Sequence, residues 1–174
     1  KAKAQLVFGP RSGAKTEEFA LAPTLAPGLI QSLIPIKVIS TETIRSSCSE
    51  KLFLNNKVYE SNRWREELEY DEQVNILANY HDDTAAVVQY KNVTYIASLT
   101  CHEFLVNFFE QLAKQCQVTT IRLPKDVRLM KRGELTFLMN YSGTVKQLPD
   151  NMGQYLLGSA ALAPYDVAIL KERG

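Results

Sequence analysis

The spacing of short apolar runs changes near Val118, and this change limits what the chain can fold into. Before it, strand-like runs alternate with segments whose apolar residues follow a helical period, which is typical of an α/β sheet. After it, strand-like runs follow one another closely, separated by turn residues such as Gly133 and Pro149-Asp150-Asn151. Such spacing favours an antiparallel sheet. We therefore predict two domains, an α/β domain over residues 1–118 and a small all-β domain over residues 119–174.

Up to residue 99, the first domain is predicted as strands interrupted by one short helical segment. Apolar residues at helical spacing predict a helix that opens at Pro27 and ends before Pro35. The other predicted elements are strands at 5–8, 36–40 and 74–80, a hairpin over 51–61 that turns at Asn55-Asn56-Lys57, and a hairpin over 84–99 that turns at Lys91-Asn92. Asparagine tolerates the positive φ angles of such turns. Residues 63–70 are ambiguous between strand and helix.

The clearest predicted element is a helix from about Cys101 to Gln115. Thr100 and Glu103 have the spacing of a capping box, in which the hydroxyl accepts an early helical N–H and the carboxylate reaches back. The apolar residues that follow share one helical face: Phe104, Leu105, Phe108, Phe109, Leu112 and Ala113. This stripe predicts that one face of the helix is buried.

The stretch VFGPRSGAKT, residues 7–16, is similar to a phosphate-binding loop but does not have its spacing. Such a loop places a lysine directly after the second glycine of G-x-x-x-x-G. Here only three residues separate Gly9 from Gly13, and Ala14 stands between Gly13 and Lys15. We therefore interpret the stretch as a turn after a strand, with Arg11 and Lys15 in solvent.

Charge and composition exclude several classes of partner. The net charge is +1 over 174 residues and the basic residues are scattered, so neither nucleic acid nor a membrane surface is expected as a partner. Three unpatterned cysteines and the absence of a secretory signal favour a cytoplasmic protein. Because the chain lacks an initiator methionine and enters a strand at once, we expect a fragment of a longer protein.

The sequence offers two candidate reaction centres, a cysteine–histidine pair and a metal site, and neither has the spacing that its chemistry requires. Cys101 and His102 are adjacent, and neighbouring residues on a helix point in different directions. We expect a capping turn with a half-buried thiol, while a free-standing amidotransferase-like enzyme that uses Cys101 stays an alternative. A metal site would have to use His81, Asp82, Asp83, His102 and Glu103. Their spacing matches no ligand pattern, so a solvated turn and a helix cap are expected instead.

The remaining candidates concern sugars. The acidic residues of one local run are Glu66, Glu67, Glu69, Asp71 and Glu72. Glycoside hydrolysis needs two carboxylates facing each other across a cleft, so we interpret this run as a solvated face. Trp64 is predicted to pack against its neighbours. A carbohydrate-binding module with Trp64 or Tyr155 as an aromatic platform stays a second alternative.

Several stretches, taken in order, resemble the family 42 glycoside hydrolases, the bacterial β-galactosidases. FGPRSGAKTEE and LAPGLIQSLIPIKVIS resemble a part of their trimerisation domain in which an R-[ST]-G turn precedes a proline-glycine-leucine helix start. WREEL, VNILANYHDD, AAVVQYKNVTYIASL and CHEFLVNFFEQLAKQCQV resemble later parts of that domain. VRLMKRGELTFLMNYSGTVKQLP, YLLG and LAPYDVAIL resemble the family's small C-terminal β domain. The chain departs from the family at Lys91-Asn92-Val93, where a Gly-x-Gly turn is usual, and at Ser98, where a glycine is usual.

The resemblance implies a fold and leaves the chemistry outside this chain. It implies the latter half of a flavodoxin-like or class I glutamine amidotransferase-like α/β sheet, followed by a small antiparallel all-β domain. The family's acid/base and nucleophile are glutamates on a (β/α)₈ barrel, and no position here matches them. The resemblance therefore implies no catalytic residue, no cofactor and no metal in this chain.

The role that the resemblance implies is architectural. The whole enzyme would hydrolyse terminal β-D-galactosides with retention, and this part would serve oligomerisation. We expect the chain to self-associate or to bind the missing barrel and half-domain, and to meet a galactoside only through the whole enzyme. The residues expected at a subunit or domain interface are Arg11, Ser12, Lys15 and Trp64.

Overall fold

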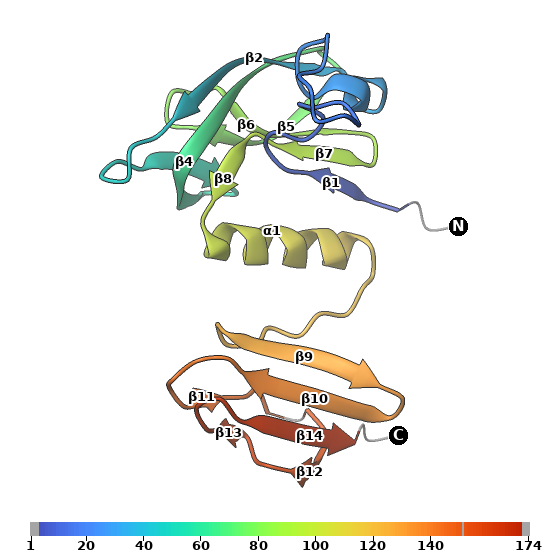
Figure 1. Cartoon of the computed structure of the whole chain (residues 1–174), viewed down its shortest axis with the longest axis vertical. Helices are drawn as coiled ribbons and strands as arrows, with labels where there is room; N and C mark the ends of the chain where they lie inside the picture. The colour runs from blue at the N-terminus through green and yellow to red at the C-terminus, as the bar shows by residue number, and fades with distance from the viewer. Residues whose placement is uncertain (1–3, 151, 172–174) are drawn as a thin grey trace. The chain divides into compact units, whose positions relative to one another are not determined.

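The computed structural model describes residues 4–150 and 152–171, which form two compact units. Figure 1 shows the chain coloured along its length. The first unit spans Lys1–Val118 and the second Thr119–Gly174. Asn151, the last residue of the turn predicted at 149–151, lies outside the described residues.

The first unit contains a mixed eight-stranded sheet. Its elements are β1 (Leu6–Phe8), the 3₁₀ helix η1 (Gly28–Ser32), β2 (Ile36–Thr43), β3 (Glu50–Leu54), β4 (Lys57–Tyr70), β5 (Asn75–Tyr80), β6 (Ala85–Tyr90), β7 (Val93–Ile96), β8 (Ser98–Thr100) and α1 (His102–Gln115). The strand order is β1-β7-β6-β5-β3-β4-β2, with β8 paired to β4. β1 runs parallel to β7, and the other described pairs are antiparallel.

Both faces of this sheet are covered, which explains the run of four buried apolar residues, 85–88, at the start of β6. Val87 and Val88 are adjacent and both are fully buried. Because successive strand residues point to opposite faces, they belong to different core clusters. Val88 packs with Ile34 and Ile36, whereas Val87 packs with Phe104 of α1. The helix therefore covers one face, and the segment around η1 covers the other (Figure 1).

The predicted fold class is confirmed, as are both hairpins of the first unit. The β3–β4 hairpin turns at Asn55 and Asn56, whose φ angles are 49° and 62°. The β6–β7 hairpin turns at Lys91, with a φ of 54°. The ambiguous segment 63–70 is a strand, since it forms the end of the long β4.

The helix predicted to open at Pro27 is only a single 3₁₀ segment, η1. Gly28, its first residue, has a φ of 57°, which lies outside the right-handed helical region. An α-helix cannot begin through this residue, and Pro35 prevents an extension at the other end. The helical spacing nevertheless identified two residues that pack together, because Ile30 and Ile34 both contact the first core cluster.

The capping box predicted at Thr100 is wrong. α1 begins at His102 with Cys101 at its N-cap, and no side chain caps it. Thr100 is the last residue of β8, where it pairs with Ser61 of β4. Since Thr100 belongs to the strand, its hydroxyl is not at the capping position, and this buried oxygen has no hydrogen-bond partner among the described residues.

The second unit is antiparallel, as predicted. Its strands are β9 (Val127–Arg132), β10 (Leu135–Asn140), β11 (Lys146–Gln147), β12 (Gln154–Leu157), β13 (Ala161–Leu162) and β14 (Val167–Lys171). Four of them form a sheet in the order β12-β14-β10-β9, and β11 pairs with β13. Buried Asn140 organises the turn after β10: its amide donates to the carbonyl oxygens of Thr144 and Ala163, both at 2.8 Å. In the parts of the chain that the structure describes, no helix is long and apolar enough to cross a membrane.

Candidate interface site

The turn after β1 presents Arg11 next to Trp64 of β4. The Arg11 guanidinium lies 5.2 Å from the centroid of the Trp64 ring, within the range of a cation–π contact. Arg11 has a φ of 66°, and its backbone N–H donates to Glu66 Oε1 at 2.8 Å. Trp64 Nε1 donates to the same oxygen at 3.0 Å. One carboxylate therefore holds both members of the pair.

Glu66 is buried, so the solvated face predicted for the acidic run is wrong at this residue. Its exposed fraction is 1%, and its second oxygen accepts from the Tyr95 hydroxyl at 2.7 Å. Burial and the adjacent Glu66 carboxylate raise the pKa of Tyr95 well above its usual range. A buried carboxylate is tolerated when donors surround it, and Glu66 has three.

The neighbour of Glu66 lies on the opposite face of the same strand. Arg65 is also buried, with Glu50 at 3.6 Å and the Tyr80 ring centroid at 4.3 Å. It donates to Asp82 and to Thr84 Oγ1. Burial alone would raise the pKa of Asp82, but hydrogen bonds from Thr84 and Arg65 outweigh it and lower the pKa to about 2.

This arrangement explains why the sequence misled us about β4. A strand with one wet face alternates polar and apolar residues, and the sequence WREEL carries consecutive charges. β4 instead buries Arg65 on one face and Glu66 on the other, with ladder irregularities on both sides. Periodicity contains no signal for two buried charges in a row.

The other two residues predicted at an interface follow Arg11 along the chain. Ser12 is half-buried in the turn, where its N–H donates to Gly9 O at 3.4 Å. Lys15 is exposed and forms an isolated bridge with Leu21. Its ammonium lies 5.9 Å from the Phe19 ring centroid. The structure therefore brings Arg11 and Trp64 together and places Lys15 on the next segment.

Two glycines fix the backbone of this region. Gly13 and Gly28 have φ angles of 67° and 57°. A Cβ added to Gly13 would stand 2.0 Å from Pro27 O, and one added to Gly28 would stand 2.4 Å from Gly13 O. Only glycine permits backbones to approach this closely at positive φ, so the loop after β1 is locked against the start of η1.

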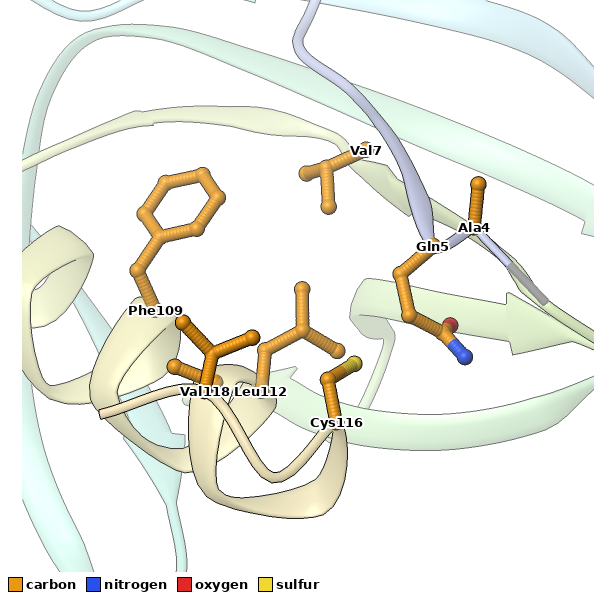
Figure 2. A pocket seen from close by; sticks show the side chains of 8 residues that line it. Ala4, Gln5, Val7, Phe109, Leu112, Cys116 and Val118 are labelled. Atoms are coloured by element: carbon orange, nitrogen blue, oxygen red, sulfur yellow. The ribbon is translucent and has the colours of Figure 1, made fainter. Parts of the chain in front are cut away.

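A second candidate surface is an apolar groove between β1 and α1. It has a volume of about 610 Å³ and is lined by Ala4, Gln5, Val7, Phe109, Leu112, Ala113, Cys116 and Val118. Figure 2 shows Val7 facing Phe109 and Leu112 across the opening. Phe109 was predicted in the buried stripe of the helix but is 47% exposed. The covering of this face of α1 is therefore incomplete within the first unit.

The reactive residues considered above are used in other ways. His81 contacts Glu50, and Asp82 binds Arg65 and Thr84. Among the described residues, no group of three or more His, Cys, Asp and Glu side chains is placed to hold a metal ion. Cys101 is partly buried against the second core cluster, while His102 is exposed.

The two aromatic residues considered as sugar platforms are both engaged. Arg11 covers the Trp64 ring, and the indole N–H is bound to Glu66. Tyr155 packs against the core of the second unit.

Comparisons with known proteins agree with this architecture in both units. A family model described as the β-galactosidase trimerisation domain matches residues 1–119, and one described as the β-galactosidase C-terminal domain matches residues 126–172. A β-galactosidase of Thermus thermophilus is 31% identical over 173 residues, which is 99% of this chain and 26% of that protein. The β-galactosidase BgaA of a Thermus species is 30% identical over the same length and share.

Solved structures show the same fold. The β-galactosidase of the psychrophilic Marinomonas ef1 superposes with a TM-score of 0.83 at 25% identity, covering 97% of this chain and 26% of that one. The enzyme of the Antarctic haloarchaeon Halorubrum lacusprofundi gives 0.80 at 24% identity, covering 97% and 27%. The chain thus spans about a quarter of the length of the relatives it matches.

The mixed sheet with its α-helix corresponds to the trimerisation model, and the small antiparallel unit corresponds to the C-terminal model. The chain belongs to the family 42 β-galactosidases, in which it corresponds to the trimerisation and C-terminal domains.

Proposed function

We propose that this chain is the assembly part of a larger β-galactosidase and performs no hydrolysis itself. The observation that carries the proposal is the match of residues 1–119 to a trimerisation domain. Hydrolysis of terminal β-D-galactosides with retention, through two carboxylates and a covalent glycosyl intermediate, would belong to the other three quarters of the protein. This chain would hold subunits or domains in place around that site.

The proposed contact residues are Arg11, Ser12, Lys15 and Trp64. Arg11 is exposed, yet its backbone is bound to Glu66 and its guanidinium rests on Trp64. A side chain already held in one conformation loses less entropy when a partner binds. Arginine and tryptophan are also the residue types most enriched at energetically important interface positions. These contacts support an interface at the turn after β1.

The groove between β1 and α1 supports a second contact, with another part of the same enzyme. Among the described strands, β1 pairs only with β7, so one of its edges is free. Gln5 Oε1 is buried beside the groove and has no partner in the described part of the chain. An added strand would provide N–H donors for this edge, and apolar side chains would fill the space between Val7 and Phe109.

Sedimentation velocity over a concentration series tests the association, and a chromogenic β-galactoside tests the missing activity. We expect residues 1–174 to self-associate at high micromolar concentration and to release no chromophore. Arg11→Glu should weaken the association, because it replaces the cation over the Trp64 ring with an anion that the face of the ring does not attract. Arg63→Glu is the matched control, since Arg63 is also exposed and also has a positive φ, of 75°. A monomer at every concentration, or measurable turnover, would contradict the proposal.

A further inference from the structure

Five large apolar side chains in residues 14–33 are exposed to solvent. We call this segment the platform. Its exposed apolar side chains, with their exposed fractions, are Phe19 (81%), Leu21 (84%), Leu25 (54%), Leu29 (93%) and Leu33 (45%). Single exposed apolar residues are ordinary on protein surfaces, whereas a group of this kind marks an interaction site.

Backbone contacts hold the platform in a defined conformation that exposes its apolar side chains. The close approach of Gly13 and Gly28 fixes its base. The N–H of Thr16 donates to Ala20 O at 2.9 Å, and the N–H of Phe19 donates to Thr16 O at 3.0 Å. Phe19 has a φ of 61°, a conformation that a bulky residue adopts only when its surroundings hold it there. The backbone therefore presents Phe19 to solvent in a fixed position.

A hollow lies on the same segment as this protruding side chain. It has a volume of about 410 Å³, and its lining includes Ala22, Pro23 and Leu29. A cavity of about 150 Å³ is enough to bind benzene, so the hollow has room for an aromatic ring. Lys15, Glu17 and Glu18 also line it, which gives it a rim with both signs of charge.

The size of the platform agrees with an interface between proteins. An aromatic side chain buries roughly 150–250 Å² and a leucine roughly 60–120 Å². Scaled by the exposed fractions given above, one phenylalanine and four leucines supply on the order of 400 Å², about half of the roughly 800 Å² that each partner contributes to a standard interface. The apolar centre and charged rim also match the usual anatomy of such a surface.

We propose that the platform binds a second copy of this chain, with Phe19 of one copy entering the hollow beside Leu29 of the next. This inference rests on the proposed function and names the partner and the contact. Protrusion and hollow are both on the platform, so the surface is complementary to itself and Phe19 of each copy meets the hollow of another copy. Lys15 of one rim would then face Glu17 or Glu18 of the other.

The test compares association constants by sedimentation velocity, with circular dichroism to verify that each variant is folded. Phe19→Ser and Leu29→Gln should each weaken association by roughly tenfold or more, as expected for central interface residues. Leu99→Gln is the control: Leu99 is 47% exposed on β8, outside the platform. We expect it to leave association unchanged.

A mixing experiment tests the pairing itself. The Phe19→Ser chain keeps an intact hollow, and the Leu29→Gln chain keeps an intact Phe19. An equimolar mixture should therefore form one complete contact per pair and associate more strongly than either variant alone. A mixture no stronger than its components would overturn the pairing.

The possible failures are distinguishable. If the unmodified chain associates and both platform variants associate equally well, the platform serves another partner and this inference is wrong, while the proposed function stands. If the unmodified chain never associates, the proposed function fails, and the platform contact fails with it.

Discussion

Glu66 shows how one buried carboxylate can organise a surface. It receives hydrogen bonds from the turn after β1, from its own strand through Trp64, and from β7 through Tyr95. The residues that the sequence nominated, Arg11 and Trp64, are exposed or half-buried, and the residue that positions both is hidden. A signal for Glu66 would have required knowing that β4 is covered on both faces.

Replacing Glu66 should therefore destabilise the first unit. Glu66→Gln replaces a charged acceptor with an amide that has only one accepting atom, so at least one donor loses its partner. We expect a loss of about 1–3 kcal/mol in the free energy of unfolding, measured by urea denaturation with the fluorescence of Trp64, the only tryptophan. The control is Glu67→Gln, since Glu67 is the exposed neighbour. Equal stabilities for the two variants would contradict the role given to Glu66.

At the scale of elements, the sequence predicted the positions of the hairpin turns but not the type of the first helix. Asn55-Asn56 and Lys91-Asn92 predicted two hairpins correctly. Asparagine tolerates the positive φ of the first turn, whereas in the second turn the positive φ is at Lys91. The helical spacing before Pro35 predicted an α-helix where only η1 forms. The reason is a tertiary contact, the approach of Gly28 to Gly13, and no local pattern reports such a contact.

This contact makes Gly28 sensitive to substitution. In Gly28→Ala, the new Cβ would stand 2.4 Å from Gly13 O at a positive φ, so the backbone must move. We expect a loss of more than about 2 kcal/mol, measured by thermal or urea unfolding. Gly9→Ala is the comparison within the same loop, because no heavy atom lies within 4 Å of its Cβ position, and it should change stability by less than about 1 kcal/mol. Similar losses of unfolding free energy at both positions would show that the contact between Gly28 and Gly13 does not contribute to stability.

At the scale of the whole molecule, the order of motifs was more informative than any single motif. Short stretches resembling one family occurred in sequence over nearly the whole chain, and the family models match 1–119 and 126–172. The sequence did not reveal the incomplete covering of α1, because a helical stripe such as Phe104 to Ala113 indicates which face is apolar and not what lies against it. Phe109 belongs to this apolar stripe, yet it lines the open groove and is 47% exposed.

The two units should fold separately, since each has a core of its own. We expect a chain cut after Val118 to yield two parts that both keep their β-sheet circular dichroism and melt cooperatively. Residues 119–174 should melt at the lower temperature, because a domain of about 60 residues buries a smaller share of its surface. An unfolded 119–174 chain would show that the boundary predicted from the sequence does not separate independent domains.

The contact between Gly13 and Gly28 also predicts which residues occur at these two positions in related sequences. Neither residue can change alone, since each lacks room for a side chain because of the backbone around the other. Two such positions should be inherited together or lost together. Their joint presence would therefore serve as a simple sequence marker for relatives that present the same surface, and the absence of one glycine would identify a lineage in which that loop has been rebuilt.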